Sequence, residues 1–160
     1  AHREAARAQV NGHYGDERCT AHNDFREVTR DPAVDLVWVC TPDHWHALPA
    51  IDAVRHGKDA YVEKPLTLTV HEGRVLVNEA RRHGRIVQTG TQQRSSKRFR
   101  EIAQFIRNGG LGRIDRIEVR IPGNNKFCGA TWSPEAVPAG LDWDLWLGPA
   151  PERPYHTAYH

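Results

Sequence analysis

The sequence DLVWVCTP at residues 35–42 and the sequence AYVEKP at residues 60–65 each join a continuous apolar run to a polar turn with a proline. Continuous apolar runs, unlike alternating ones, are typical of strands that are buried in a parallel sheet. A similar run, Ile86–Thr89, follows at a comparable interval. Strand starts about 25 residues apart suit short strand–helix–strand units. The sequence therefore predicts an α/β fold with a parallel sheet.

Helical patterns fill the intervals between these runs. The first helix is expected between Asp43, as its N-cap, and Gly57, as its end. The second is expected between Thr69 and Gly84, where Thr69 and Glu72 match a capping box. The apolar positions of the two helices are Ala47, Ala50, Ile51 and Val54 in the first, and Val70, Leu76, Val77 and Ala80 in the second.

The flanking segments carry weaker patterns. Residues 19–21 are expected to form a short edge strand, and residues 25–30 a helix. Ser95 or Ser96 is expected to cap a further helix that ends near Gly109, with its apolar face on Phe99, Ile102, Ala103 and Ile106. Apolar residues then alternate with charged ones over residues 113–121, which predicts an antiparallel strand with one wet face. The change of pattern places a domain boundary near Gly110.

Composition excludes several classes of protein. The 160 residues carry a formal net charge of +2 with mixed signs, unlike the clustered Lys and Arg of a nucleic-acid-binding surface. No apolar run approaches the ~20 residues of a membrane span, and no signal peptide leads the chain. The 3 cysteines show no CxxC spacing, which favours reduced thiols over a disulfide or a reactive thiol. We expect a cytoplasmic protein, with export left open because the chain lacks a starting methionine and reads as an internal fragment.

Polar residues follow each expected strand. They are Thr41 to His46 after the first, Glu63 to Pro65 after the second, and Gly90 to Arg94 after the third. The carboxyl ends of parallel strands share one edge of a sheet, where ligands bind in α/β folds. Pro65 restricts the backbone of the preceding Lys64 to an extended conformation, so the lysine is held in position rather than free.

These motifs resemble the Gfo/Idh/MocA family of nicotinamide-dependent oxidoreductases. The resemblance rests on VCTPDHWH at residues 39–46, YVEKPL at 61–66 and QTGTQQR at 88–94. LDWDLWLGP at residues 141–149 extends it. It implies a partial doubly wound parallel sheet of the Rossmann type over residues 1–110, without its first strand and glycine-rich loop. Residues 111–160 would begin a C-terminal substrate and oligomerisation domain, an α/β domain with a mostly antiparallel open sheet.

The resemblance also implies the roles of individual residues. Lys64 would be the catalytic residue, beside the nicotinamide and the reacting carbon, with NAD or NADP as the cofactor. A cis peptide bond before Pro65 and a trans one are both open at this stage. The residues implied to bind the cofactor are Thr41, Pro42, His46, Glu63, Lys64, Pro65 and Gln92.

A lysine suits this chemistry. Removing a hydride from an alcohol carbon requires loss of the hydroxyl proton and stabilisation of the oxygen's developing negative charge. A nearby ammonium stabilises that charge, and burial or a second cation makes its own proton easier to lose. Glu63, as a neighbouring carboxylate, would oppose that loss.

Two elements of the family pattern fall outside this chain: the glycine-rich phosphate loop with the residue that selects NAD or NADP, and the aspartate and histidine of a later helix. We therefore expect residues 1–160 alone to bind the cofactor poorly.

Other candidate residues keep more than one interpretation. His44 and His46 are two residues apart with no third ligand nearby, so no metal site is expected. Arg94, Lys97, Arg98 and Arg100 form either a solvated basic face or a contact for a cofactor phosphate or an anionic partner. Trp143 and Trp146 serve either packing or contact with a sugar or cofactor.

The sequence as a whole predicts an NAD(P)-dependent dehydrogenase that acts on a hydroxyl carbon of a sugar, a cyclitol or a derivative. The parent protein is expected to be a homo-oligomer that binds neither nucleic acid nor membranes. A glycosidase of the same fold, with NAD reduced and reoxidised in each turnover, is one alternative. A non-catalytic sugar or nucleotide sensor is the other.

Overall fold

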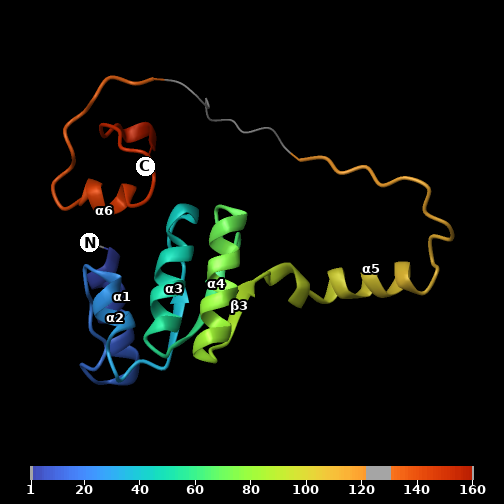
Figure 1. Ribbon diagram of the computed structural model, residues 1–160, viewed down its shortest axis with the longest axis horizontal. Coiled ribbons are helices and arrows are strands. Elements are labelled where there is room, and N and C mark those ends of the chain that lie inside the picture. Colours follow the sequence, from blue (N-terminus) through green and yellow to red (C-terminus); the bar gives the residue numbers. More distant parts are fainter. Residues whose placement is uncertain (1, 122–130, 160) are drawn as a thin grey trace. The chain divides into compact units, whose positions relative to one another are not determined.

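The computed structural model describes residues 2–121 and 131–159. These residues divide into two compact units, 1–90 and 91–160. Each unit is described by itself below (Figure 1). The domain boundary expected near Gly110 falls inside the second unit and stays a prediction.

The first unit is built on a three-stranded sheet of β1 (Leu36–Val39), β2 (Asp59–Glu63) and β3 (Val87–Gly90). The strands are neighbours in the order β1-β2-β3, and both pairs are parallel. The sequence-based prediction of three parallel strands is confirmed, with bounds that differ by one residue at most ends.

Two helices, α3 (Ala47–Arg55) and α4 (Val70–His83), connect these strands and lie side by side in Figure 1. A 2.7 Å ion pair from Arg55 Nε to Glu79 Oε2 joins them, and this neighbour lowers the pKa of the Glu79 carboxyl. Their apolar faces and one face of the sheet form the core. Its buried residues are Val39, Ala47, Ala50, Ile51, Val54, Ala60, Val62 and Leu76.

The opposite face of the sheet has less cover than the sequence predicts. Continuous apolar runs indicate burial on both faces of the sheet. However, Leu36 is exposed, and Trp38 is 64% exposed. Trp38 contacts Tyr61 edge to face, with ring centroids 5.4 Å apart. The apolar run in β1 therefore has two different environments, with Val39 in the core and Trp38 at the surface.

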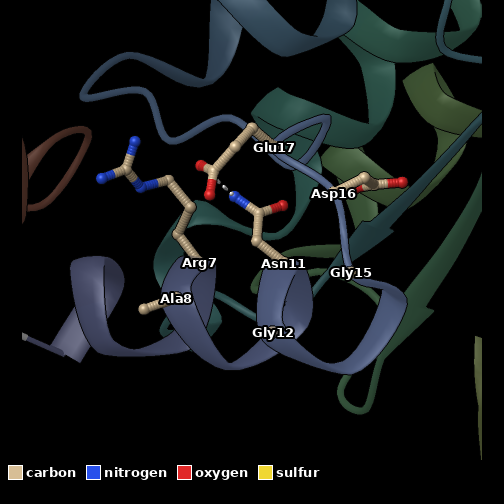
Figure 2. Close-up of a pocket in the computed structure, with 7 residues that line it drawn as sticks. All are labelled: Arg7, Ala8, Asn11, Gly12, Gly15, Asp16 and Glu17. Atoms are coloured by element: carbon tan, nitrogen blue, oxygen red, sulfur yellow. Dashed lines mark hydrogen bonds between the residues drawn. The ribbon is translucent and has the colours of Figure 1, made fainter.

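The expected edge strand at residues 19–21 is absent, and a side-chain amide takes its place. Cys19 donates its backbone N–H to Asn11 Oδ1 at 2.9 Å, and its carbonyl accepts from Asn11 Nδ2 at 3.2 Å. Asn11 lies in α1 (His2–Tyr14) and also reaches Glu17, as Figure 2 shows. Both backbone groups that a neighbouring strand would pair are thus already satisfied. The helix expected next is present as α2 (Phe25–Thr29).

The helix ends were predicted unevenly. The Thr69–Glu72 capping box of α4 is confirmed, and Gly84 ends that helix at φ 61°, a left-handed conformation that favours glycine. Asp43 does not cap α3, because the short helix η1 (Asp43–Trp45) comes first and His46 holds the N-cap position. Val70 was wrongly assigned to the apolar face of α4, since as its first residue it is 93% exposed.

The second unit begins with η2 (Gln92–Ser95) and α5 (Lys97–Arg107). Ser96 takes the N-cap position but makes no capping hydrogen bond. The expected apolar face of α5 is largely solvent-exposed, and no strand forms over residues 113–121, where Ile117, Val119 and Ile121 are also exposed. A strand needs a partner, and no segment of the described chain pairs with this one. Two short helices, α6 (Trp143–Leu147) and η3 (Thr157–Tyr159), complete the unit.

Leu76 tests the core of the first unit. Leu76 is 1% exposed, so Leu76→Ala should leave a cavity and lower the free energy of unfolding by about 2–5 kcal/mol. Val70→Ala, on the exposed end of the same helix, should change it by no more than ~0.5 kcal/mol. Urea unfolding of both variants measures the difference, and equal effects would contradict this packing.

Candidate functional site

The carboxyl ends of the three strands meet at one edge of the sheet. Val39 pairs with Val62, and Glu63 pairs with Gly90, so the three strands end at nearly the same level. The turns after β1 and β2 therefore start side by side, as the sequence predicts. Thr41 and Pro42 are exposed in the turn after β1, and Lys64 and Pro65 are exposed in the turn after β2.

Lys64 presents its side chain to solvent at this edge. Its backbone N–H donates to Glu63 Oε2 at 3.3 Å, and the Lys64–Pro65 peptide bond is cis. Within residues 2–121 and 131–159, its ammonium group forms neither an ion pair nor a hydrogen bond. In the described residues Glu63 therefore contacts the backbone of Lys64 and forms no ion pair with its ammonium group. The lysine remains available to a ligand.

His46 connects the two turns from inside the protein. The residue is 1% exposed, and its ring nitrogens lie 2.5 Å from the Pro65 carbonyl oxygen and 2.7 Å from the Thr41 carbonyl oxygen. The structure therefore brings together Thr41, His46 and Pro65 among the predicted site residues. Gln92 lies in the second unit, in η2, two residues beyond the end of β3.

Sequence reasoning missed Cys40 and Tyr61 at this edge, and it did not predict the crowding around Gly90. Desolvation raises the pKa of the Cys40 thiol, and the negative charge of Glu63 raises it further. A Cβ atom on Gly90 would lie 2.9 Å from Tyr61 Cε1 and 3.2 Å from Glu63 Oε1. Gly90 thus leaves the room that these two side chains occupy. The register pairs Glu63 with Gly90, and Cys40 directly follows Val39, the last residue of β1 that pairs with β2.

Two cavities are lined by other residues than those of these turns. One, of about 480 Å³, is beside α1 in the first unit, and Figure 2 shows Arg7, Asn11 and Glu17 around it. The other, of about 500 Å³, lies along η2 and α5 in the second unit, where Arg94, Arg100 and Arg107 line it with uncharged neighbours. Arg94 and Arg100 belong to the predicted basic run, whose role in anion binding stays a prediction.

The tryptophans of the second unit pack against each other. Trp143 and Trp146 stack with centroids 4.9 Å apart and ring planes 12° apart, and Tyr155 meets Trp143 edge to face. Trp143 also donates its indole N–H to the Arg153 carbonyl at 2.9 Å. These contacts support the packing interpretation of both tryptophans over contact with a sugar.

The described ranges contain no group of three or more His, Cys, Asp or Glu residues placed to hold a metal ion. No helix in the same ranges is long and apolar enough to span a membrane.

Parallel strands with polar turns at a shared edge are typical of α/β domains that bind ligands at this edge. Residues 1–91 match the sequence model of the Gfo/Idh/MocA oxidoreductases that describes an NAD-binding Rossmann fold. Residues 97–160 match the C-terminal α/β domain of the same oxidoreductases. The chain belongs to the Gfo/Idh/MocA family.

Individual relatives are consistent with this assignment. The scyllo-inositol 2-dehydrogenase (NADP(+)) IolW of Bacillus subtilis is 30% identical over 124 residues, which cover 77% of this chain and 35% of that protein. The glycosyl hydrolase family 109 protein 1 of Shewanella sp. (strain ANA-3) is 47% identical over 58 residues, covering 36% of this chain and 13% of that protein. A probable dehydrogenase structure from Thermotoga maritima aligns with a TM-score of 0.57 at 28% identity, covering 69% of this chain and 33% of that one. The chain thus spans about a third of the length of IolW.

Cys40 reports on the electrostatics of this edge. Because desolvation and the Glu63 carboxylate both raise the pKa of the Cys40 thiol, its alkylation should reach half-maximal rate at a pH above that of an ordinary cysteine. Glu63→Gln removes a negative charge, so the midpoint should shift to lower pH. Iodoacetamide labelling followed by mass spectrometry of the Cys40 peptide measures both midpoints.

Glu4→Gln, which removes an exposed carboxylate in α1 of the same unit, provides the control and should leave the midpoint of Cys40 in place. A midpoint that Glu63→Gln does not move would show that Glu63 has no electrostatic effect on this edge.

Proposed function

We propose that the protein containing this chain is an NAD(P)-dependent oxidoreductase acting on a hydroxyl carbon of a sugar, a cyclitol or a derivative. The observation that carries this proposal is Lys64, exposed and without a charged partner in the described ranges, at the carboxyl edge of a Rossmann-type sheet. The inositol dehydrogenase relative supports the cyclitol class of substrate. NAD and NADP both remain candidates for the cofactor.

The residues at this edge fit a nicotinamide cofactor. The exposed turns at Thr41-Pro42 and Lys64-Pro65 lie at the carboxyl edge of the sheet, which is the edge where dinucleotides bind in open α/β sheets. A bound nicotinamide would accept or donate the hydride. In the proposed arrangement Thr41 and Pro42 contact its ribose side, Glu63 lies near the nicotinamide ribose, and Gln92 approaches the nicotinamide or the substrate.

In the proposed reaction Lys64 transfers the proton and stabilises the negative charge on the substrate oxygen. When the alcohol is oxidised, the carbon loses a hydride and the hydroxyl group loses a proton, so negative charge develops on the oxygen. A neutral Lys64 amine accepts the hydroxyl proton, and the ammonium that this forms stabilises the negative charge on the oxygen. In the reverse direction, the ammonium returns the proton to the carbonyl oxygen.

A second candidate is the glycosidase with the same fold. The match to a family 109 glycosyl hydrolase supports this alternative, because its sequence identity is higher than that of IolW, although it covers fewer residues. Adding sugars and polyols with NAD or NADP should cause net accumulation of the reduced cofactor if the protein is a dehydrogenase. Glycoside cleavage without net reduced cofactor would favour the glycosidase.

For the assembly, we propose a homo-oligomer in which residues 111–160 begin the substrate and oligomerisation domain. The match of residues 97–160 to the family's C-terminal domain supports a second domain. Light scattering of the full-length protein tests the oligomeric state.

Substitution of Lys64 tests the proposed chemistry. In the full-length protein, Lys64→Ala should lower kcat by about 10²–10⁴-fold, because the group that transfers the proton and stabilises the charge is lost. Arg18→Ala, which removes another exposed cation of the first unit, should leave kcat unchanged. Steady-state kinetics measure both variants, and near-normal turnover by Lys64→Ala would remove Lys64 from the mechanism.

A further inference from the structure

His46 lies between η1 and α3 in the sequence. Its buried side chain contacts the turns that carry Thr41 and Lys64. Its ring is 1% exposed, so it cannot contact a ligand at the surface without a rearrangement. The residue occupies the N-cap position of α3, but its side chain makes no capping hydrogen bond. The ring therefore has a role other than stabilising the first turn of its own helix.

Both ring nitrogens face hydrogen-bond acceptors. Nδ1 lies 2.5 Å from the Pro65 carbonyl oxygen, and Nε2 lies 2.7 Å from the Thr41 carbonyl oxygen. A carbonyl oxygen accepts hydrogen bonds and has no hydrogen to donate, while a neutral imidazole has only one N–H. For both contacts to be hydrogen bonds, each ring nitrogen must carry a hydrogen.

The two carbonyl groups lie where the sheet no longer holds the turns together. The pairing between β1 and β2 ends with Val39 and Val62, so Thr41 lies two residues and Pro65 three residues beyond the last pair. Pro65 also follows Lys64 directly, and it has no backbone N–H with which to continue a ladder. The imidazole joins these turns beyond the end of the strand pairing.

We propose that His46 is a positioning residue that fixes the turn carrying Lys64 relative to the turn carrying Thr41, by donating one hydrogen bond to each. This inference rests on the proposed function only for its catalytic consequence. Loss of either hydrogen bond frees the Lys64-Pro65 turn to move away from Thr41. Small displacements of a reacting group can cost about 10²-fold in rate.

A purely structural histidine would have different consequences. It would contribute to the stability of the fold, and its replacement would leave the kinetics of the folded protein unchanged. A positioning residue affects kcat/KM in a protein that is still folded. The bonding pattern is also directly measurable, because each ring nitrogen with an attached hydrogen has its own signature in nitrogen-15 NMR.

The test uses the full-length protein with nitrogen-15-labelled histidine, at neutral pH. The signal of His46 is assigned among those of the other histidines by its disappearance in His46→Gln. We expect attached hydrogens on both Nδ1 and Nε2. His46→Gln retains one donor group that can reach only one carbonyl, so kcat/KM for NAD(P) should fall by about 10²-fold while the circular dichroism of the folded protein is retained. His71→Gln, the same exchange at an exposed position in α4, should change neither property.

A His46 ring with one unprotonated nitrogen would overturn the proposal, and so would unchanged kcat/KM in His46→Gln. The NMR measurement on the unaltered protein decides the bonding pattern even if His46→Gln fails to fold. Full activity in Lys64→Ala, together with a doubly protonated His46, would instead contradict the proposed function and leave the link between the turns intact.

Discussion

Parallel pairing of β1, β2 and β3 is the constraint on which the candidate site depends. Because Val39 pairs with Val62, and Glu63 with Gly90, the turns after β1 and β2 emerge together at one edge. Burial of α3 and α4 against one face of the sheet holds this register. A slip of a single residue would move core side chains to the opposite face, so the packing that stabilises the unit also positions Lys64.

Where no neighbouring strand pairs the backbone, side chains form the hydrogen bonds instead. Asn11 satisfies the backbone of Cys19 in place of a neighbouring strand, and the His46 ring contacts the Thr41 and Pro65 carbonyls. Both side chains are buried, so each hydrogen bond avoids the cost of an unpaired polar group in the interior. The His46 ring thus links the two turns that the proposed chemistry requires.

Local patterns in the sequence predicted the sheet, α3, α4 and the Thr69 capping box, because propensity, burial and caps agree in these segments. The two strands that were predicted wrongly, at residues 19–21 and 113–121, depend on a pairing partner that a local pattern does not reveal. Residues 113–121 alternate like a strand but pair with no segment in the described ranges, and the backbone of Cys19 is bonded by Asn11. The motifs identified the turns at Thr41 and Lys64, whereas the close approach of Tyr61 and Glu63 to Gly90 follows only from the structure.

The central claim is that the edge carrying Thr41 and Lys64 holds the nicotinamide, with the lysine at the reacting oxygen. A crystal structure of the full-length protein with NAD(P) and a bound polyol tests this claim most directly. The account predicts Lys64 Nζ within hydrogen-bond distance of the hydroxyl oxygen on the carbon that faces the nicotinamide. A nicotinamide ring bound away from the turns after β1 and β2, with Lys64 directed into solvent, would contradict it.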